Sequence, residues 1–261
     1  SADVSSTVPV LLTLLKHPRL HLLDRKPIPI QNPAGTLAGN LRVTLPLNSD
    51  LKFEDVDIRA KGKLSGLRLG GLVAGRDLDR GDVTVDVTQQ GMHVAGQAAV
   101  GGILGAVAVD LDFRDGGPAQ VIRQASLSGR ATAWQLAAAG LDAGGLAGAG
   151  QAAVKAAYSA RRDGQATVEV QADLRDVALS VAGWTKAAGQ PATANAQLVL
   201  RDDRLLGIRS LDARGPGMEV RGRAEMVGDR PRRLVLDPIH LGPTRARGEI
   251  RLPGSPGEPI R

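Results

Sequence analysis

The chain has 261 residues, a formal net charge of +6 and no cysteine. The lack of cysteine excludes a disulfide-stapled secreted module, and no stretch has the roughly 18 uncharged apolar residues that a membrane-spanning helix needs. Hydrophobic residues make up 43% of the chain but aromatic residues only 2%, so its apolar surfaces consist of Val, Leu, Ala and Gly rather than of aromatic rings.

Residues 1–34 are predicted to form a lead-in of one helix and one extended segment. Four apolar residues have helical spacing, namely Val10, Leu11, Leu14 and Leu15. Pro18 ends any helix, and the prolines of segment 27–30 favour extended backbone. His17 and His21 have the spacing of two metal ligands on a helix, but Pro18 lies between them and no acidic third ligand is near. We therefore expect no metal and no cofactor.

Residues 35–133 alternate apolar and polar side chains, as half-buried β-strands do, and are predicted to form a first section of sheet. Strands are expected at 41–47, 53–60, 83–87, 92–100 and 107–113. Turn residues are expected to separate strands at 48–50, 80–82 and 115–118.

An Ala/Gly-rich stretch at 134–150 interrupts this pattern and is predicted to be a loop or a short helix near 135–139. Alternation resumes in residues 151–261, for example at 167–174. Because the same type of strand resumes, we expect this second section to continue the first sheet and its groove rather than to begin a separate domain.

An internal repeat indicates the shape of the sheet. Residues 91–98 match residues 217–224 glycine for glycine, and looser copies occur at 35–41 and 244–250. A glycine in mid-strand often marks a bend or a bulge, so its repetition would curl the sheet in one direction. The predicted fold is all-β: an elongated, curled antiparallel sheet of repeated hairpins that forms a groove, with one or two short helices.

The aliphatic face of this sheet is the candidate binding site. The predicted groove-lining residues are Val83, Val85, Val87, Val94, Val109, Leu111, Val168, Val170, Leu198, Leu200, Met218 and Val220. The alternative is that the same face packs on itself or on a helix as an ordinary core.

The sequence contains no catalytic constellation, so we expect the protein not to be an enzyme. The glycines of 145–150 have the reverse order of a dinucleotide-binding motif and no strand before them. The aspartates within 77–82 do not complete a calcium loop and are interpreted as turn residues. His93 and His240 have no nucleophile or acid near them in a catalytic context.

The last third of the chain is basic, with thirteen arginines against nine acidic residues from Arg201 onward. Such a surface favours anionic partners, including lipid headgroups. Nucleic acid is not expected as a partner, because this third has no aromatic residue for base stacking and its arginines alternate with acids. A solvated outer strand face is the simpler interpretation.

Soft patterns of glycine, proline and aliphatic residues recur in a characteristic order, at 27–30 before Gly35, 44–47, 91–96, 183–186 before Gly189, and 236–237 before 241–244. In these segments the chain resembles the AsmA-like superfamily of bacterial envelope proteins, and in particular its large YhdP-type members. The resemblance covers nearly the whole chain. It implies a long curled sheet with an apolar groove, an inner-membrane anchor near the N-terminus, a body in the periplasm and phospholipid movement toward the outer membrane. It carries over no catalytic residue.

The function expected from the resemblance is that of a segment of a periplasmic bridge-like lipid-transfer protein. The groove would shield phospholipid acyl chains, and the partners would be phospholipids, the inner membrane through an anchor outside this chain, and other envelope proteins. The chain begins at Ser1 without an initiator Met and ends after a Pro/Gly-rich turn, so we interpret it as a piece of a longer protein. The alternative function is a non-transporting periplasmic scaffold that binds envelope proteins.

Overall fold

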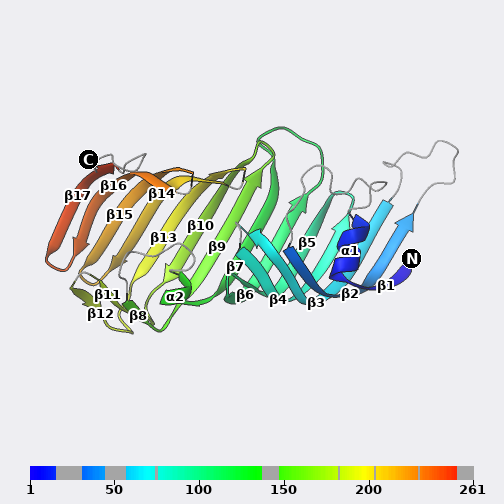
Figure 1. Ribbon diagram of the computed structural model, residues 1–261, viewed down its shortest axis with the longest axis horizontal. Helices are drawn as coiled ribbons and strands as arrows, with labels where there is room; N and C mark the ends of the chain where they lie inside the picture. Colours follow the sequence, from blue (N-terminus) through cyan, green and yellow to red (C-terminus); the bar gives the residue numbers. More distant parts are fainter. Residues whose placement is uncertain are drawn as a thin grey trace. The chain divides into compact units, whose positions relative to one another are not determined.

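The computed structural model describes residues 1–15, 31–44, 57–73, 76–136, 147–181, 183–202, 204–228 and 230–251. Within these ranges fourteen strands form one open sheet in the order β1-β2-β3-β4-β5-β6-β7-β9-β10-β13-β14-β15-β16-β17, and β12-β11-β8 form a second sheet (Figure 1). Strands of the large sheet follow one another in chain order and pair antiparallel, as in a meander. The predicted all-β class and antiparallel sheet with two short helices are confirmed.

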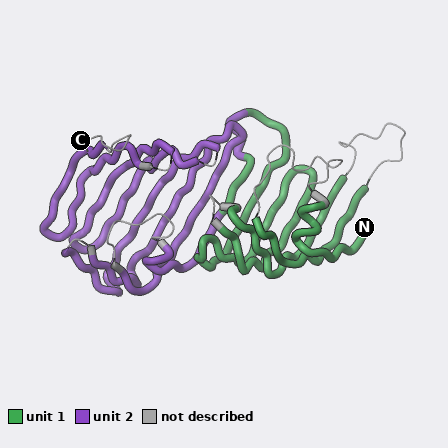
Figure 2. Tube along the Cα trace, in the orientation of Figure 1, with its two compact units in different colours: residues 1–117, 122–125 green, residues 118–121, 126–261 purple. Residues whose placement is uncertain are grey.

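The chain divides into two compact units (Figure 2). Unit 1 comprises residues 1–117 and 122–125, and unit 2 comprises residues 118–121 and 126–261. Strand β7 (Val121–Thr132) contributes residues to both units. The division falls between β6 and the middle of β7, before the Ala/Gly-rich stretch at 134–150.

The described residues of unit 1 form one helix and six complete strands. Their bounds are β1 (Ala2–Thr7), α1 (Val8–Leu15), β2 (Gln31–Thr44), β3 (Asp57–Val73), β4 (Arg76–Thr88), β5 (Gly91–Val100) and β6 (Ile103–Asp112). The helix lies where the apolar spacing predicted one, and it packs against β1 and β2. Gly101 and Gly102, both at positive φ, form the two-residue turn between β5 and β6.

The segment Arg80–Asp82, predicted to be a turn between strands, is instead an irregularity inside β4. Arg80 has a positive φ of 50°, and the pairing of β4 with β5 shifts register between Asp79 and Asp82. The turn prediction was wrong because Gly and Asp in sequence mark both turns and bulges, and only the pairing partner distinguishes them. Residues 115–118 do separate two strands, β6 and β7. The turn predicted at 48–50 lies outside the described residues.

In unit 2 the described part of the chain forms the rest of β7, a short helix and ten further strands. Their bounds are α2 (Ala133–Leu136), β8 (Ala147–Ala149), β9 (Gln151–Arg161), β10 (Gln165–Asp173), β11 (Ala178–Val181), β12 (Trp184–Lys186), β13 (Thr193–Arg201), β14 (Arg204–Gly215), β15 (Met218–Val227), β16 (Arg230–Leu241) and β17 (Thr244–Arg251).

Helix α2 begins two residues before the predicted one, because a capping box sets its start. The Gln135 backbone N–H donates to Thr132 Oγ1 at 3.2 Å, and the Thr132 N–H donates to Gln135 Oε1 at 2.8 Å. Two N–H groups at the start of the helix are thus satisfied reciprocally.

The three-stranded sheet is fixed to one edge of unit 2 by Trp184. Its indole Nε1 donates to the Pro216 carbonyl oxygen at 3.0 Å, in the turn between β14 and β15. A Cβ atom at Gly217 would lie 3.2 Å from the Trp184 Nε1, and one at Gly242, in the turn between β16 and β17, would lie 3.7 Å from the Trp184 Cδ1, so the ring leaves little room for a side chain at either turn. The Gly242 N–H donates to the Gly217 carbonyl at 2.8 Å, so the two turns lie side by side under the tryptophan.

The buried side chain of Lys186 connects β12 to the backbone that precedes β11. Its side chain is 2% exposed, and its Nζ donates to the carbonyl oxygens of Arg175, Val177 and Ala187 at 3.2, 2.7 and 3.0 Å. A lysine ammonium has three donors, and here all three find acceptors. These three hydrogen bonds offset the cost of burying the ammonium group, and they favour the backbone path that brings the three carbonyl groups together.

Candidate functional site

In unit 1, strand register places aliphatic residues opposite one another on one face of the sheet. Directly paired residues of an antiparallel sheet share a face, so each chain of pairs defines a row across the strands. Three such rows run from β1 to β6: Val4-Gly39-Gly62-Val85-Val94-Val109, Ala2-Leu41-Ala60-Val87-Met92-Leu111 and Ser6-Leu37-Leu64-Val83-Gly96-Val107. The only polar residue in these rows is Ser6. We call this surface the aliphatic face of unit 1.

Unit 2 has a face of the same composition. Three rows run from β9 to β17: Val154-Ala172-Ala194-Ala213-Val220-Ile239-Ala246, Ala156-Val170-Ala196-Leu211-Gly222-Leu236-Gly248 and Tyr158-Val168-Leu198-Ile208-Ala224-Leu234-Ile250. No residue in these rows is charged, and the Tyr158 hydroxyl is their only polar side-chain group. This surface is the aliphatic face of unit 2.

All twelve predicted groove residues lie on these two faces. Ten of them belong to the rows above. Leu200 lies two residues beyond Leu198 on the same face and pairs with Ala166 and Leu205. Met218 lies two residues before Val220 on the same face and pairs with Leu241. Val83 and Leu200 are buried, at 3% and 6% exposed, whereas the other ten are half-buried. A second layer of protein would bury such residues completely. The described residues therefore leave most of both aliphatic faces partly open.

Sequence reasoning missed several residues of the same faces, such as Leu37, Met92, Leu211 and Leu236. Alternation alone could have found Met92, since it lies two residues before Val94. Leu211 and Leu236 were harder, because register shifts within β14 and β16 break the strict alternation on either side of them.

The opposite face of unit 1 carries a row of charges. Lys61, Asp86, His93 and Asp110 are paired in turn from β3 to β6. Lys61 Nζ lies 2.7 Å from Asp86 Oδ2, and His93 Nδ1 lies 2.6 Å from Asp110 Oδ1. Basic and acidic side chains thus alternate along a solvated row, and His93 has a carboxylate partner that sequence proximity did not indicate.

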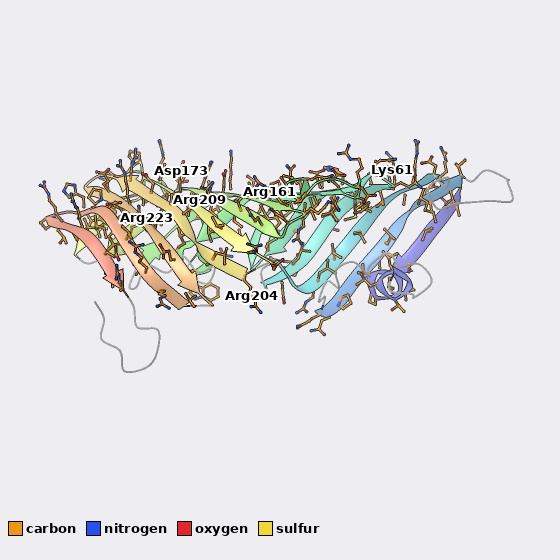
Figure 3. The ribbon with its side chains drawn as sticks, turned by 90° about the horizontal axis from the view of Figure 1, so that it is seen from above. Lys61, Arg161, Asp173, Arg204, Arg209 and Arg223 are labelled. Atoms are coloured by element: carbon orange, nitrogen blue, oxygen red, sulfur yellow. The ribbon has the colours of Figure 1, made fainter. Side chains whose placement is uncertain are left out.

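The opposite face of unit 2 is also charged. Arg161, Asp173, Arg209 and Arg223 lie along one side of the ribbon, whereas Arg204 lies apart from them at the end of its hairpin (Figure 3). A residue at a strand end borders both faces of the sheet.

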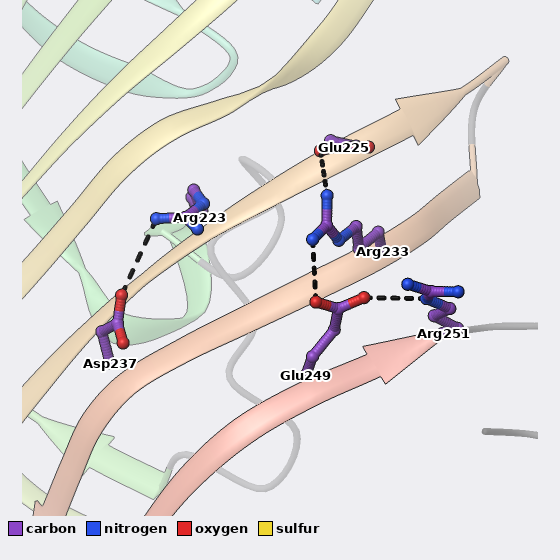
Figure 4. A network of polar contacts seen from close by, with 6 residues as sticks. All are labelled: Arg223, Glu225, Arg233, Asp237, Glu249 and Arg251. Atoms are coloured by element: carbon purple, nitrogen blue, oxygen red, sulfur yellow. Dashed lines mark hydrogen bonds and ion pairs between the residues drawn. The ribbon is translucent and has the colours of Figure 1, made fainter.

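Strands β15, β16 and β17 are joined on this face by ion pairs (Figure 4). Arg233 contacts Glu225 at 3.2 Å and Glu249 at 2.8 Å, and Arg251 Nε donates to Glu249 at 2.8 Å. Arg223 lies 3.7 Å from Asp237. Most of these side chains are exposed, so each pair contributes little to stability, and the network mainly fixes the pairing of neighbouring strands.

The hydrogen bonds from Arg233 and Arg251 lower the pKa of Glu249 from 4.5 to about 2. A pKa that is lower in the folded than in the unfolded chain stabilises the fold above pH 4.5, and this contribution is lost as the pH falls through about 2. We expect a carboxylate titration followed by NMR to give Glu249 a midpoint near 2. Arg233→Gln should move that midpoint back toward 4.5, whereas Arg223→Gln, whose partner is Asp237, should leave it in place. An unchanged midpoint in Arg233→Gln would contradict the assignment.

Of the other residues singled out in the sequence, those that the structure describes form no reactive cluster. Asp77 accepts from the Gly71 N–H at 3.0 Å and lies 3.8 Å from Arg68, and Asp79 pairs with Arg80 at 3.1 Å. Among the described residues no group of three or more His, Asp or Glu side chains is arranged to hold a metal ion. His17, His21 and the first glycine of 145–150 lie outside the described residues.

Helices of the described ranges are all too short to cross a membrane. No protein-family model, curated protein or solved structure matches the chain.

Proposed function

We propose that the chain is a segment of a periplasmic bridge-like lipid-transfer protein of the AsmA-like type, and that its aliphatic faces shield phospholipid acyl chains. The observation that carries this proposal is the composition of the rows. In each unit, three consecutive rows across the strands contain no charged residue, and most of their larger side chains are half-buried.

The dimensions of these faces suit an acyl chain. Three rows two residues apart make a stripe about 14 Å wide, and seven strands at about 4.8 Å spacing extend it to roughly 29 Å in unit 2. The acyl chains of one bilayer leaflet occupy about 15 Å, half of the hydrocarbon thickness. A stripe of this size accommodates a whole chain within one unit.

The small side chains of the faces favour the sliding of an acyl chain over its tight binding at one position. Burial of each CH₂ group contributes about 0.8 kcal/mol, so complete burial of a 16-carbon chain would hold it by about 12 kcal/mol and make release slow. An open face covers one side of the chain and binds it less tightly. Glycine and alanine fill many row positions, such as Gly39, Gly62 and Ala196, and they present no ring or polar group that would stop a sliding chain.

The proposal is tested by native mass spectrometry and lipid extraction on the chain purified from a periplasm. We expect phospholipid to copurify and, after removal by detergent, to be taken up again from vesicles of phosphatidylethanolamine and phosphatidylglycerol. A folded chain that carries no lipid and takes up none would overturn the proposal. It would favour the alternative of a scaffold, whose protein partner should dissociate as the salt concentration rises.

A further inference from the structure

The strands of the unit 2 sheet turn along two borders, one at each end of the strands. These two borders, here called edges, differ in chemistry. In an antiparallel meander alternate turns lie at the same edge. The turns at 215–218 and 241–244 lie at one edge, which Trp184 and the three-stranded sheet cover. The turns at 161–165, 201–204 and 227–230 lie at the other edge. The first two of these touch, because the Asp202 N–H donates to the Gly164 carbonyl at 3.0 Å.

Exposed arginines lie at or near several strand ends along this second edge, Arg161 toward the charged face and Arg204 apart from it (Figure 3). Arg201 pairs with Gln165 on one side and with Arg204 on the other, and Arg161 ends β9 next to the pair Ala160–Ala166. A fourth arginine, Arg232, follows the turn between β15 and β16 at a register shift. All four side chains are exposed. We call Arg161, Arg201, Arg204 and Arg232 the arginine edge.

The described acids of these turns do not neutralise the arginine edge. Asp163 accepts from the Gln165 backbone N–H at 3.0 Å, and the Asp202 carboxylate lies against Gly164. Within the described part of the chain, which omits Asp203 and Asp229, no acid forms an ion pair with any of the four arginines. Arg201 and Arg204 stand directly opposite each other, an arrangement that like charges disfavour unless an anion lies between them.

The arginine edge also borders the aliphatic face directly. Ala160, Ala166 and Leu200 form a buried cluster with Leu205 packed against it. Ala160, Leu200 and Leu205 are each adjacent in sequence to an arginine of the edge. Apolar side chains of the face and guanidinium groups of the edge therefore belong to neighbouring residues of the same strand. A phospholipid has the same sequence of chemistry, in which acyl chains lead to a glycerol and then to a phosphate.

We propose that the arginine edge binds the phosphate of a phospholipid headgroup while the acyl chains lie on the aliphatic face of unit 2. This inference rests on the proposed function. Arginine donates paired N–H groups that match phosphate oxygens, and exposed arginines spaced along several turns offer successive sites rather than one trap. The headgroups leave the face on one side only, because the three-stranded sheet covers turns at the other edge.

The test compares two lipids with identical acyl chains, phosphatidylglycerol and diacylglycerol, which differ in the phosphate headgroup. Competition between them is measured by native mass spectrometry on the intact chain. The edge variant is Arg201→Gln with Arg204→Gln. The matched control is Arg175→Gln with Arg245→Gln, which removes the same charge from exposed arginines near the opposite edge. Urea unfolding checks that both variants keep the stability of the parent chain.

We expect the parent chain and the control variant to prefer phosphatidylglycerol. The edge variant should lose that preference by about tenfold, the effect of one charge-assisted hydrogen bond, and still bind diacylglycerol. Retention of the preference in the edge variant would overturn the inference. Binding of neither lipid by the parent chain would instead reject the proposed function itself. If glycerol 3-phosphate binds the lipid-free chain as tightly as phosphatidylglycerol does, the edge is a site for free phosphates, and the headgroup assignment is wrong.

Discussion

Val109→Asp and Val170→Asp are each expected to remove most of the lipid bound by their own unit, and the double variant should lose copurified lipid by about tenfold or more. Val109 pairs with Val94 and is the last residue of the middle row of unit 1, and Val170 pairs with Ala156 and Ala196 in the middle row of unit 2. A carboxylate on either face would have to lose its water under an acyl chain, which costs several kcal/mol. Native mass spectrometry of the purified variants measures the lipid that remains.

The same variants distinguish an open face from a closed core. On a half-exposed face the aspartate keeps its water, and the free energy of unfolding should fall by about 1 kcal/mol, the range of strand propensities. In a sealed core the loss would be about 3 kcal/mol or more, because an unpaired charge would be buried.

Val199→Asp is the matched control for Val170→Asp. Val199 pairs with Thr167 and Gly207 on the charged face of unit 2, so its replacement makes the same chemical change on the other side of the sheet. Lipid binding should persist in this variant. Equal loss of lipid in Val170→Asp and Val199→Asp would mean that unfolding, rather than the chemistry of the aliphatic face, is responsible.

Alternation was sufficient to predict the faces because period two is a local property of the chain. Val85, Val94 and Val109 come from three strands, yet each could be assigned to the apolar side from its immediate neighbours. What alternation could not predict is an interaction between distant segments. The buried Lys186 reads as a surface residue in sequence, and only the carbonyl groups of Arg175, Val177 and Ala187 make its burial favourable.

The arginine edge illustrates the same limit for the candidate site. Arg201 and Arg232 appear in sequence as members of a basic but acid-interrupted stretch, which is typical of a solvated strand face. Arg201 and Arg232 differ from arginines that form ion pairs, such as Arg221, because they lie at turns. To recognise this, one must know which residues form the turns and which turns lie at the same edge. That assignment needs the strand order and the register shifts, which composition does not contain.

Gly39→Val is expected to destabilise unit 1 by roughly 3 kcal/mol, because β2 and β3 approach each other closely at Gly39 and Gly62. A Cβ atom at Gly39 would lie 2.3 Å from the Lys61 carbonyl oxygen and 2.7 Å from Gly62 Cα, which are backbone atoms that cannot rotate away. The strands would have to separate in the middle row of the aliphatic face, between Val4 and Val85. Urea unfolding measures the loss.

Gly248→Val in β17 separates this steric effect from the general effect of changing a strand glycine. Gly248 also lies in a middle row, opposite Leu236, but a Cβ atom there would meet no atom within 4 Å. Its replacement should leave stability unchanged or raise it by up to about 1 kcal/mol, since valine favours strands and glycine costs entropy on folding. If both variants were equally stable, the close approach of β2 and β3 would not constrain the sheet. If only Gly39→Val loses stability, the glycines of the aliphatic rows have different roles. Gly39 permits the close approach of two strands, whereas Gly248 leaves the surface of the face without a protruding side chain.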